Sequence, residues 1–106
     1  MKDVIAERKL VASYPNDCAV QVTIRIGRPM PHPKGDWGCP VQGEGLRVWE
    51  GPTEIVGIDA WQALTLGLLF LRKMLRAEVE EEAVFHWEDG EDAIQIDELF
   101  AVDYTV

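Results

Sequence analysis

Residues 59–77 read DAWQALTLGLLFLRKMLRA, and this stretch decides the fold. Asp59 is a good helix N-cap, and Gln62 three residues later completes a capping box. Apolar side chains recur at three- and four-residue spacing, which is typical of one face of a helix. We therefore expect one long helix over about 59–77, with a buried stripe made of Trp61, Leu64, Leu68, Leu71 and Leu75.

The residues before this helix predict β-strands. Over positions 18–26, apolar side chains alternate with others, a period of two that is typical of a strand with one buried face. A Tyr-Pro-Asn-Asp turn at 14–17 joins this strand to an earlier one over 4–12, so we expect an antiparallel hairpin. Two more strands are expected over 37–41 and 46–50, after a loop over 27–36 whose prolines lack the N–H of a central strand.

The residues after the helix predict an acidic link over 78–82 and then a hairpin. Apolar runs at 83–87 and 93–97 flank an Asp-Gly pair, a standard hairpin signal. We expect a single α+β domain over residues 1–106, with an antiparallel sheet of four to six strands and one long helix packed on one face. Besides the helical stripe, its expected core contains Cys18, Val20, Val22, Ile24 and Ile26.

Charge is unevenly distributed along the chain. Residues 1–56 carry seven basic and seven acidic side chains, whereas residues 57–106 carry three basic and twelve acidic ones. A surface of one sign attracts a basic protein partner and disfavours direct binding of nucleic acid. The acidic turn of the predicted hairpin, residues 88–92, lacks the residue order of an EF-hand calcium loop, so we expect no metal there. The expected partner-binding residues are Trp87, Glu88, Asp89, Glu91 and Asp92.

The alternative to partner binding is that these acids form a solvated face that only keeps the protein soluble. In either case, some acids of the segment after the helix are expected to fold back on the cationic helix end (Arg72, Lys73 and Arg76) or on Arg25 and Arg47.

The predicted helix is apolar well beyond one stripe, so more than one of its sides must be covered. The simplest interpretation is that the sheet covers one side and the acidic hairpin another. The alternative is an interface with a second copy or a partner, formed by Leu66, Leu69, Phe70 and Met74.

The case for an enzyme is thin, because the chain contains no nucleophile elbow, phosphate-binding loop, zinc-protease or dinucleotide motif. We therefore expect no enzyme, no catalytic residue and no cofactor. The alternative is a small enzyme or ligand-binding domain with a pocket near Cys39, His32 and Trp37. A nucleophilic thiol needs a base and a field that lowers its pKa, whereas most free cysteines are buried apolar residues.

Localisation follows from what the sequence lacks. The longest apolar stretch, Leu66–Leu71, is far shorter than the about 20 residues of a membrane span. The N-terminus shows no signal peptide, and Cys18 and Cys39 show no metal-ligand spacing. We expect a cytoplasmic protein with reduced thiols and no membrane partner.

The stretch Gly57-Ile58-Asp59-Ala60-Trp61-Gln62-Ala63-Leu64 resembles the G-x-D-x-x-Q-A-L signature of a family of small bacterial proteins catalogued as a domain of unknown function. Asp36-Trp37-Gly38-Cys39 and the segment 85–92 resemble its other motifs. No activity comes with this family. Its size and plan are similar to those of small immunity proteins that neutralise bacterial toxins, which is analogy alone.

These observations favour a protein-protein binding module of immunity or inhibitor type that uses an acidic C-terminal surface. A dimeric accessory protein held by its helix is the alternative from a different class.

Overall fold

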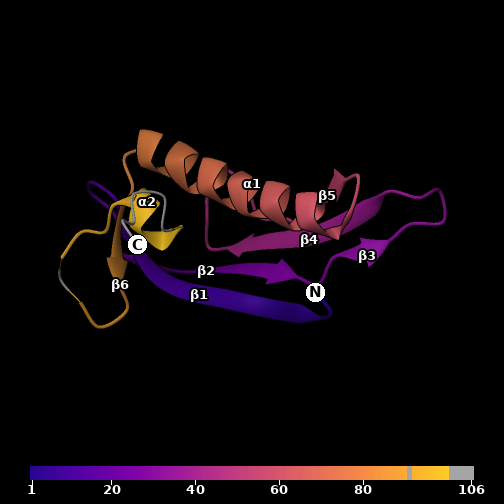
Figure 1. The fold of residues 1–106 in the computed structure, drawn as a ribbon. Helices are drawn as coiled ribbons and strands as arrows, with labels where there is room; N and C mark the ends of the chain where they lie inside the picture. Colours follow the sequence, from indigo (N-terminus) through magenta and orange to yellow (C-terminus); the bar gives the residue numbers. More distant parts are fainter. Residues whose placement is uncertain (91, 101–106) are drawn as a thin grey trace.

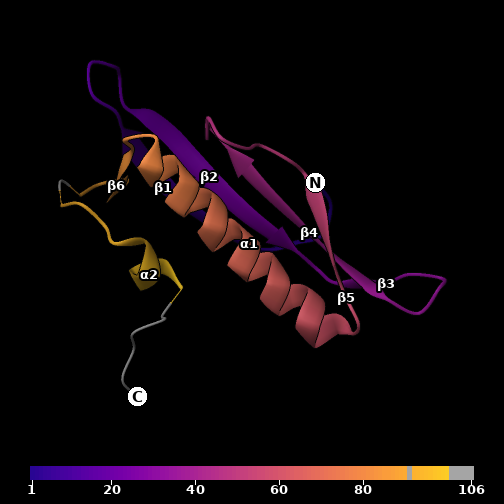
Figure 2. The same cartoon turned by 90° about the horizontal axis from the view of Figure 1, so that it is seen from above.

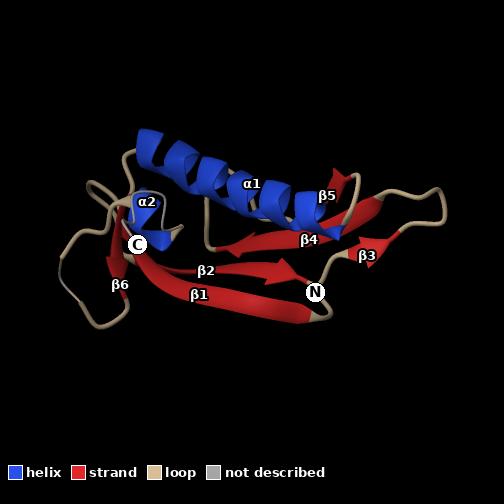
Figure 3. Cartoon of the chain, viewed as in Figure 1, coloured by secondary structure: helices blue, strands red, loops and turns tan. Residues whose placement is uncertain are grey.

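The computed structural model describes residues 1–90 and 92–100 of the chain. The strands are β1 (Val4–Ser13), β2 (Val20–Gly27), β3 (Met30–Pro31), β4 (Trp37–Glu44), β5 (Thr53–Gly57) and β6 (Val84–Trp87). The helices are α1 (Ala60–Glu80) and the short α2 (Ile96–Leu99). Figures 1 and 3 show two layers, in which α1 lies along one face of the sheet.

The sheet is antiparallel throughout, with the strand order β3-β4-β2-β1-β6 and β5 paired to β4. β4 pairs with β2 through Val41–Glu44 and with β5 through Trp37–Val41. β6 pairs with residues 10–13 at the end of β1. The predicted α+β class, the β1–β2 hairpin and an antiparallel sheet of four to six strands with one long helix on one face are thus confirmed.

The helix begins as the sequence predicts. The Asp59 side chain accepts a hydrogen bond from the Gln62 N–H at 2.8 Å. The Gln62 side chain in turn accepts from the N–H of Ile58 at 2.8 Å, one residue before the expected partner of a capping box. α1 continues beyond the expected end at 77 to Glu80, so the predicted acidic link is partly helical.

The predicted buried stripe of α1 is wrong at Trp61 and Leu68, while Leu64 is half-buried and packs against the core. Trp61 is 81% exposed and Leu68 is 39% exposed, whereas Ala63 and Gly67 are buried. A Cβ on Gly67 would lie 3.1 Å from the Cys39 sulfur and 3.3 Å from a methyl of Ile26. The helix therefore approaches the sheet through its smallest residues, and the large side chains turn outward. Only in its second half do Leu71 and Leu75 enter the core as predicted.

The expected core of the second strand is largely confirmed. Val22, Ile24 and Ile26 are buried and Val20 is half-buried, but Cys18 is exposed because it lies in the turn before β2 begins. The rest of the core comes from other elements, and its fully buried side chains include Leu10 of β1, Cys39 and Val41 of β4 and Phe85 of β6.

Two predicted strands are wrong. Residues 46–50 form a loop, because the N–H groups of Arg47 and Val48 bond to a helix side chain and not to a neighbouring strand. The strand of this region is β5, which the sequence analysis missed. Residues 93–97 make only an isolated bridge, between Ala93 and His86, before α2 begins at Ile96.

Candidate functional site

Acidic side chains from two segments gather at one end of the molecule. Glu80, Glu81 and Glu82 are exposed where α1 ends, and Glu88, Asp89 and Asp92 are exposed after β6. Both segments lie at the same end of the elongated fold in Figures 1 and 2, beside the β1–β2 turn. We call these six residues the acidic end. Glu91, a predicted member, lies outside the described residues.

Arginines, in contrast, are engaged within the molecule. Their partners are Trp87 for Arg8, Glu7 and Glu44 for Arg25, Asp3 for Arg28, Asp17 for Arg47, and Asp97 for both Arg72 and Arg76. The charge at the acidic end is therefore left facing solvent.

Asp97 is the acid that folds back on the cationic part of the helix, as the sequence predicts. Its carboxylate accepts hydrogen bonds from Arg72 at 2.9 Å and from Arg76 at 2.7 Å. The hydrogen bond from Arg72 holds the pKa of Asp97 below its ordinary value. Among the described residues, the acids that pair with Arg25, the alternative position, are Glu7 and Glu44 of the sheet.

Trp87 is only half-buried, and its ring is already covered in part. The Arg8 guanidinium lies 5.0 Å from the ring centroid, a cation–π contact. Glu88 next to it accepts a hydrogen bond from the Gln21 side chain at 3.0 Å. Arg8, Trp87, Glu88 and Asp89 border an open hollow of about 470 Å³, so the acidic turn is also flanked by positive charge from β1.

A buried acid that the sequence analysis missed lies next to the acidic end. Glu78 is fully buried, and one carboxylate oxygen accepts from the N–H groups of Arg47 at 2.9 Å and Val48 at 3.0 Å. The other oxygen accepts from the Tyr14 hydroxyl, whose pKa is raised, mainly by burial and then by this bond. The available signal was spacing: Glu78 follows Leu71 and Leu75 on the buried side of α1.

The Arg47 side chain completes this cluster. Its guanidinium carbon lies 3.7 Å from the centre of the Tyr14 ring, and the group also pairs with Asp17. The cluster ties three segments together: the β1–β2 turn, the loop before β5 and the end of α1. Each polar group of the cluster is bonded to another member of it, so the cluster has a structural role.

The predicted helix interface is divided between the surface and the core. Leu69 is 50% exposed and Leu66 is also exposed. Phe70 packs edge-on against Trp49, with ring centroids 5.0 Å apart, and Met74 is half-buried. The most exposed apolar residues lie elsewhere, at the start of α1, where Ile58 is 75% exposed beside Trp61.

The structure does not bring Cys39 and His32 together. Cys39 is fully buried, its thiol donates to the Gly27 carbonyl at 3.5 Å, and burial raises its pKa. The sulfur faces α1, whereas His32 pairs with Glu54 across Gly38, on the opposite face of the same strand. A thiol that is buried and hard to ionise is a poor nucleophile.

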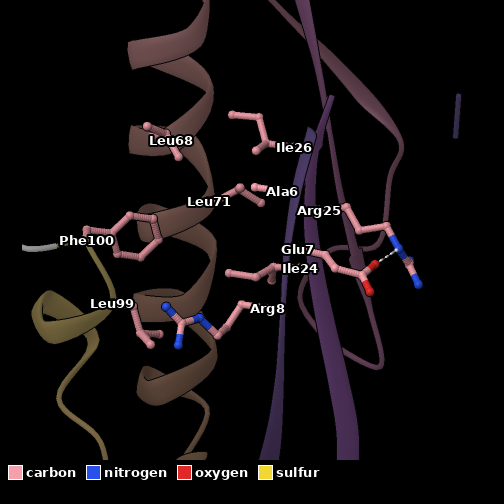
Figure 4. Close-up of a pocket in the computed structure, with 10 residues that line it drawn as sticks. All are labelled: Ala6, Glu7, Arg8, Ile24, Arg25, Ile26, Leu68, Leu71, Leu99 and Phe100. Carbon is pink, nitrogen blue, oxygen red and sulfur yellow. Dashed lines mark hydrogen bonds and ion pairs between the residues drawn. The ribbon is translucent and has the colours of Figure 1, made fainter. Parts of the chain in front are cut away.

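A small apolar hollow lies between α1 and the first two strands, and the sequence analysis did not predict it. Figure 4 shows Leu68 and Leu71 of the helix facing Ile24, Ile26 and Ala6 of the strands. Leu99 and Phe100 close one side, and Arg8 points into the space beside them. Its volume is about 170 Å³, which is below the range of typical small-molecule sites.

Two further findings apply only to the residues that the structure describes. They contain no group of three or more His, Cys, Asp or Glu side chains placed to hold a metal ion. Neither described helix combines the length and the apolarity that crossing a membrane requires.

The fold and surface define a small two-layer α+β protein with one helix-covered sheet face and one strongly acidic end. The chain belongs to the family described as a domain of unknown function, DUF6968, whose model matches residues 6–97. This confirms the resemblance to a family of unknown function. No curated protein and no solved structure matches the chain.

Proposed function

We propose that this protein is a protein-protein binding module of immunity or inhibitor type that takes a basic partner at its acidic end. The observation that carries the proposal is the contrast between engaged arginines and outward-facing acids. A field of one sign speeds the encounter with a partner of opposite sign and repels nucleic acid. The field therefore favours a protein partner with a cluster of Lys and Arg.

A charge reversal at one place tests this proposal. The tagged protein is used to capture proteins from its own cell lysate, in parallel with Asp89→Lys and Glu50→Lys. Both variants change the net charge equally, and both positions are exposed, but Glu50 belongs to the loop before β5. We expect a basic partner that Asp89→Lys loses and Glu50→Lys retains, with capture weakening as salt increases. Equal capture by all three proteins would refute a role for the acidic end.

A dimeric accessory protein is the second candidate, favoured by the exposed apolar residues of α1. Two copies that each carry a net charge of −9 repel one another, so self-association is most favourable where acids are absent. The face formed by Trp61, Thr65 and Leu69 meets this condition. Light scattering at micromolar concentration measures the mass, and a 12.0 kDa species for both wild type and Leu69→Glu would eliminate this candidate.

A further inference from the structure

Three strands lie side by side at the end of the sheet that is remote from the acidic end (Figure 1). β4 is in the middle, where Gly38 lies opposite Met30 of β3 and opposite Val56 of β5. The turn between β3 and β4 contains His32 and Asp36. Glu54 lies on β5, so the two sides of this region are separated by one strand.

Gly38 provides the space in which the two sides meet. A Cβ at this position would overlap the carboxyl group of Glu54, so the Glu54 side chain lies over the β4 backbone. It thereby reaches across the strand to the His32 ring, where its carboxylate lies 3.0 Å from Nε2. Any larger residue at position 38 would block this contact.

Both ring nitrogens of His32 face carboxylates. Nδ1 lies 2.8 Å from the Asp36 carboxylate, and Nε2 faces Glu54. Ionised carboxylates only accept hydrogen bonds, and only the doubly protonated imidazole has two N–H groups to donate. The geometry therefore fits the imidazolium form. Consistently, hydrogen bonds to Glu54 and then to Asp36 raise the pKa of His32.

Few backbone hydrogen bonds hold this hairpin. β3 has only two residues, and Pro29, Pro31 and Pro33 have no N–H to donate. The turn itself is closed by the His32 N–H to the Asp36 carbonyl at 2.8 Å and by the Gly35 N–H to the His32 carbonyl at 3.0 Å. β4 itself is held to β5 by backbone pairing, so the side-chain bridge to Glu54 is the tie that joins the turn between β3 and β4 to β5.

We propose that His32 is a pH-sensitive latch that holds the turn between β3 and β4 against β5 and releases this turn when the ring loses a proton, while β4 stays paired with β5. The neutral ring keeps one N–H, so one carboxylate then faces a ring lone pair. The facing charged groups are Asp36 from the hairpin and Glu54 from β5, while β4 contributes Gly38 and no charge; Lys34, in the same turn, is exposed.

The direction of the pH effect follows from the raised pKa. The latch contributes fully below the ordinary pKa of histidine, about 6.5, and its contribution is lost as the pH rises through the raised value. The rise in the pKa and the favourable contribution of the latch have the same cause, because both come from the hydrogen bonds that the protonated ring makes to Glu54 and Asp36. The turn between β3 and β4 is therefore expected to open at a pH above the ordinary pKa of histidine.

Nuclear magnetic resonance of the full-length, ¹⁵N-labelled protein tests the latch between pH 6 and 9. We expect both His32 ring nitrogens to be protonated at neutral pH and to titrate above free histidine. The Gly35 amide, corrected for intrinsic exchange, should lose protection in step with that titration. His32→Gln should remove this step, whereas His86→Gln, which changes the other histidine, should keep it.

Glu54→Gln provides a second readout that is independent of the fold of the His32 variant. It removes one negative charge beside Nε2, so the His32 titration should move to lower pH. The latch would be refuted by a wild-type midpoint at or below that of free histidine. Constant protection of the Gly35 amide across the titration would refute it equally.

Discussion

Removing Glu78 is the perturbation for which the structure gives the clearest expectation. In Glu78→Ala, the Tyr14 hydroxyl loses its acceptor in a buried place, and the N–H groups of Arg47 and Val48 lose theirs in a part-buried one. Each group left without its partner costs about 1–3 kcal/mol when buried, while removal of a buried charge returns part of this cost. Summed over the three groups, we expect a net loss of about 3–5 kcal/mol in the free energy of unfolding.

This loss is large for a domain of 106 residues, whose whole stability is of the order of 5–15 kcal/mol. Milder variants separate the contributions. Tyr14→Phe removes one hydrogen bond to a charged group and should cost about 1.5–3 kcal/mol. Glu78→Gln keeps the volume and one carbonyl acceptor, so its cost should lie well below that of Glu78→Ala.

Urea unfolding followed by tryptophan fluorescence measures these differences, with Trp49 as a reporter in the affected loop. Glu81→Ala is the matched control, because Glu81 is exposed at the same helix end and its change should stay within about 0.5 kcal/mol. If Glu78→Ala costs less than about 1 kcal/mol, the carboxylate does not hold the loop and the reasoning is wrong.

Three other outcomes are expected. Gly67→Ala should destabilise the protein by about 1 kcal/mol in thermal unfolding, because overpacking against the Cys39 sulfur at 3.1 Å outweighs the gain in helix propensity; a stabilised variant would contradict this. A thiol reagent should label Cys18 at once and Cys39 only on unfolding, and rapid labelling of both would show an open core. Asp97→Asn should reduce the loss of stability at acidic pH by the share that wild type loses as the pH falls through the lowered pKa of Asp97, since the Arg72 bond needs the carboxylate. Parallel pH profiles of the two proteins would contradict this.

Periodicity was sufficient for the elements whose side chains alternate or repeat regularly. The alternation at Val22, Ile24 and Ile26 predicted β2 and its buried face. The Asp59 cap predicted where α1 begins. Local chemistry decides these features, so a sequence pattern reports them directly.

The misassigned helix face has a different cause. Hydrophobic size predicts that the large apolar residues are buried, yet Gly67 and Ala63 form the contact because the sheet comes close to the helix there. Hydrophobic size measures what burial would gain, but the distance between layers decides which side chains fit. Ala63 and Gly67 are small residues at four-residue spacing in the sequence, and continuing that spacing to Leu71 and Leu75 indicates the correct face.

The Glu78 cluster and the Gly38 gap depend on tertiary contacts. Glu78 lies 64 residues from Tyr14 and about 30 from Arg47 and Val48 in the chain, so no local pattern relates them. The same holds for His32 and Glu54, which meet only because β4 separates them by one glycine. At the candidate site, the excess of acidic over basic side chains could be predicted from the sequence. The partners that the arginines bind elsewhere in the fold could not.

The length of α1 sets how partners can be arranged on this protein. Its 21 residues span about 32 Å, from Trp61 near the start to Glu80 at the acidic end. That distance is several Debye lengths at physiological ionic strength, about 8 Å each, so the field of the acidic end is largely screened at Trp61. The two ends of the helix are therefore electrostatically independent surfaces, and a charge changed at one of them has little effect at the other.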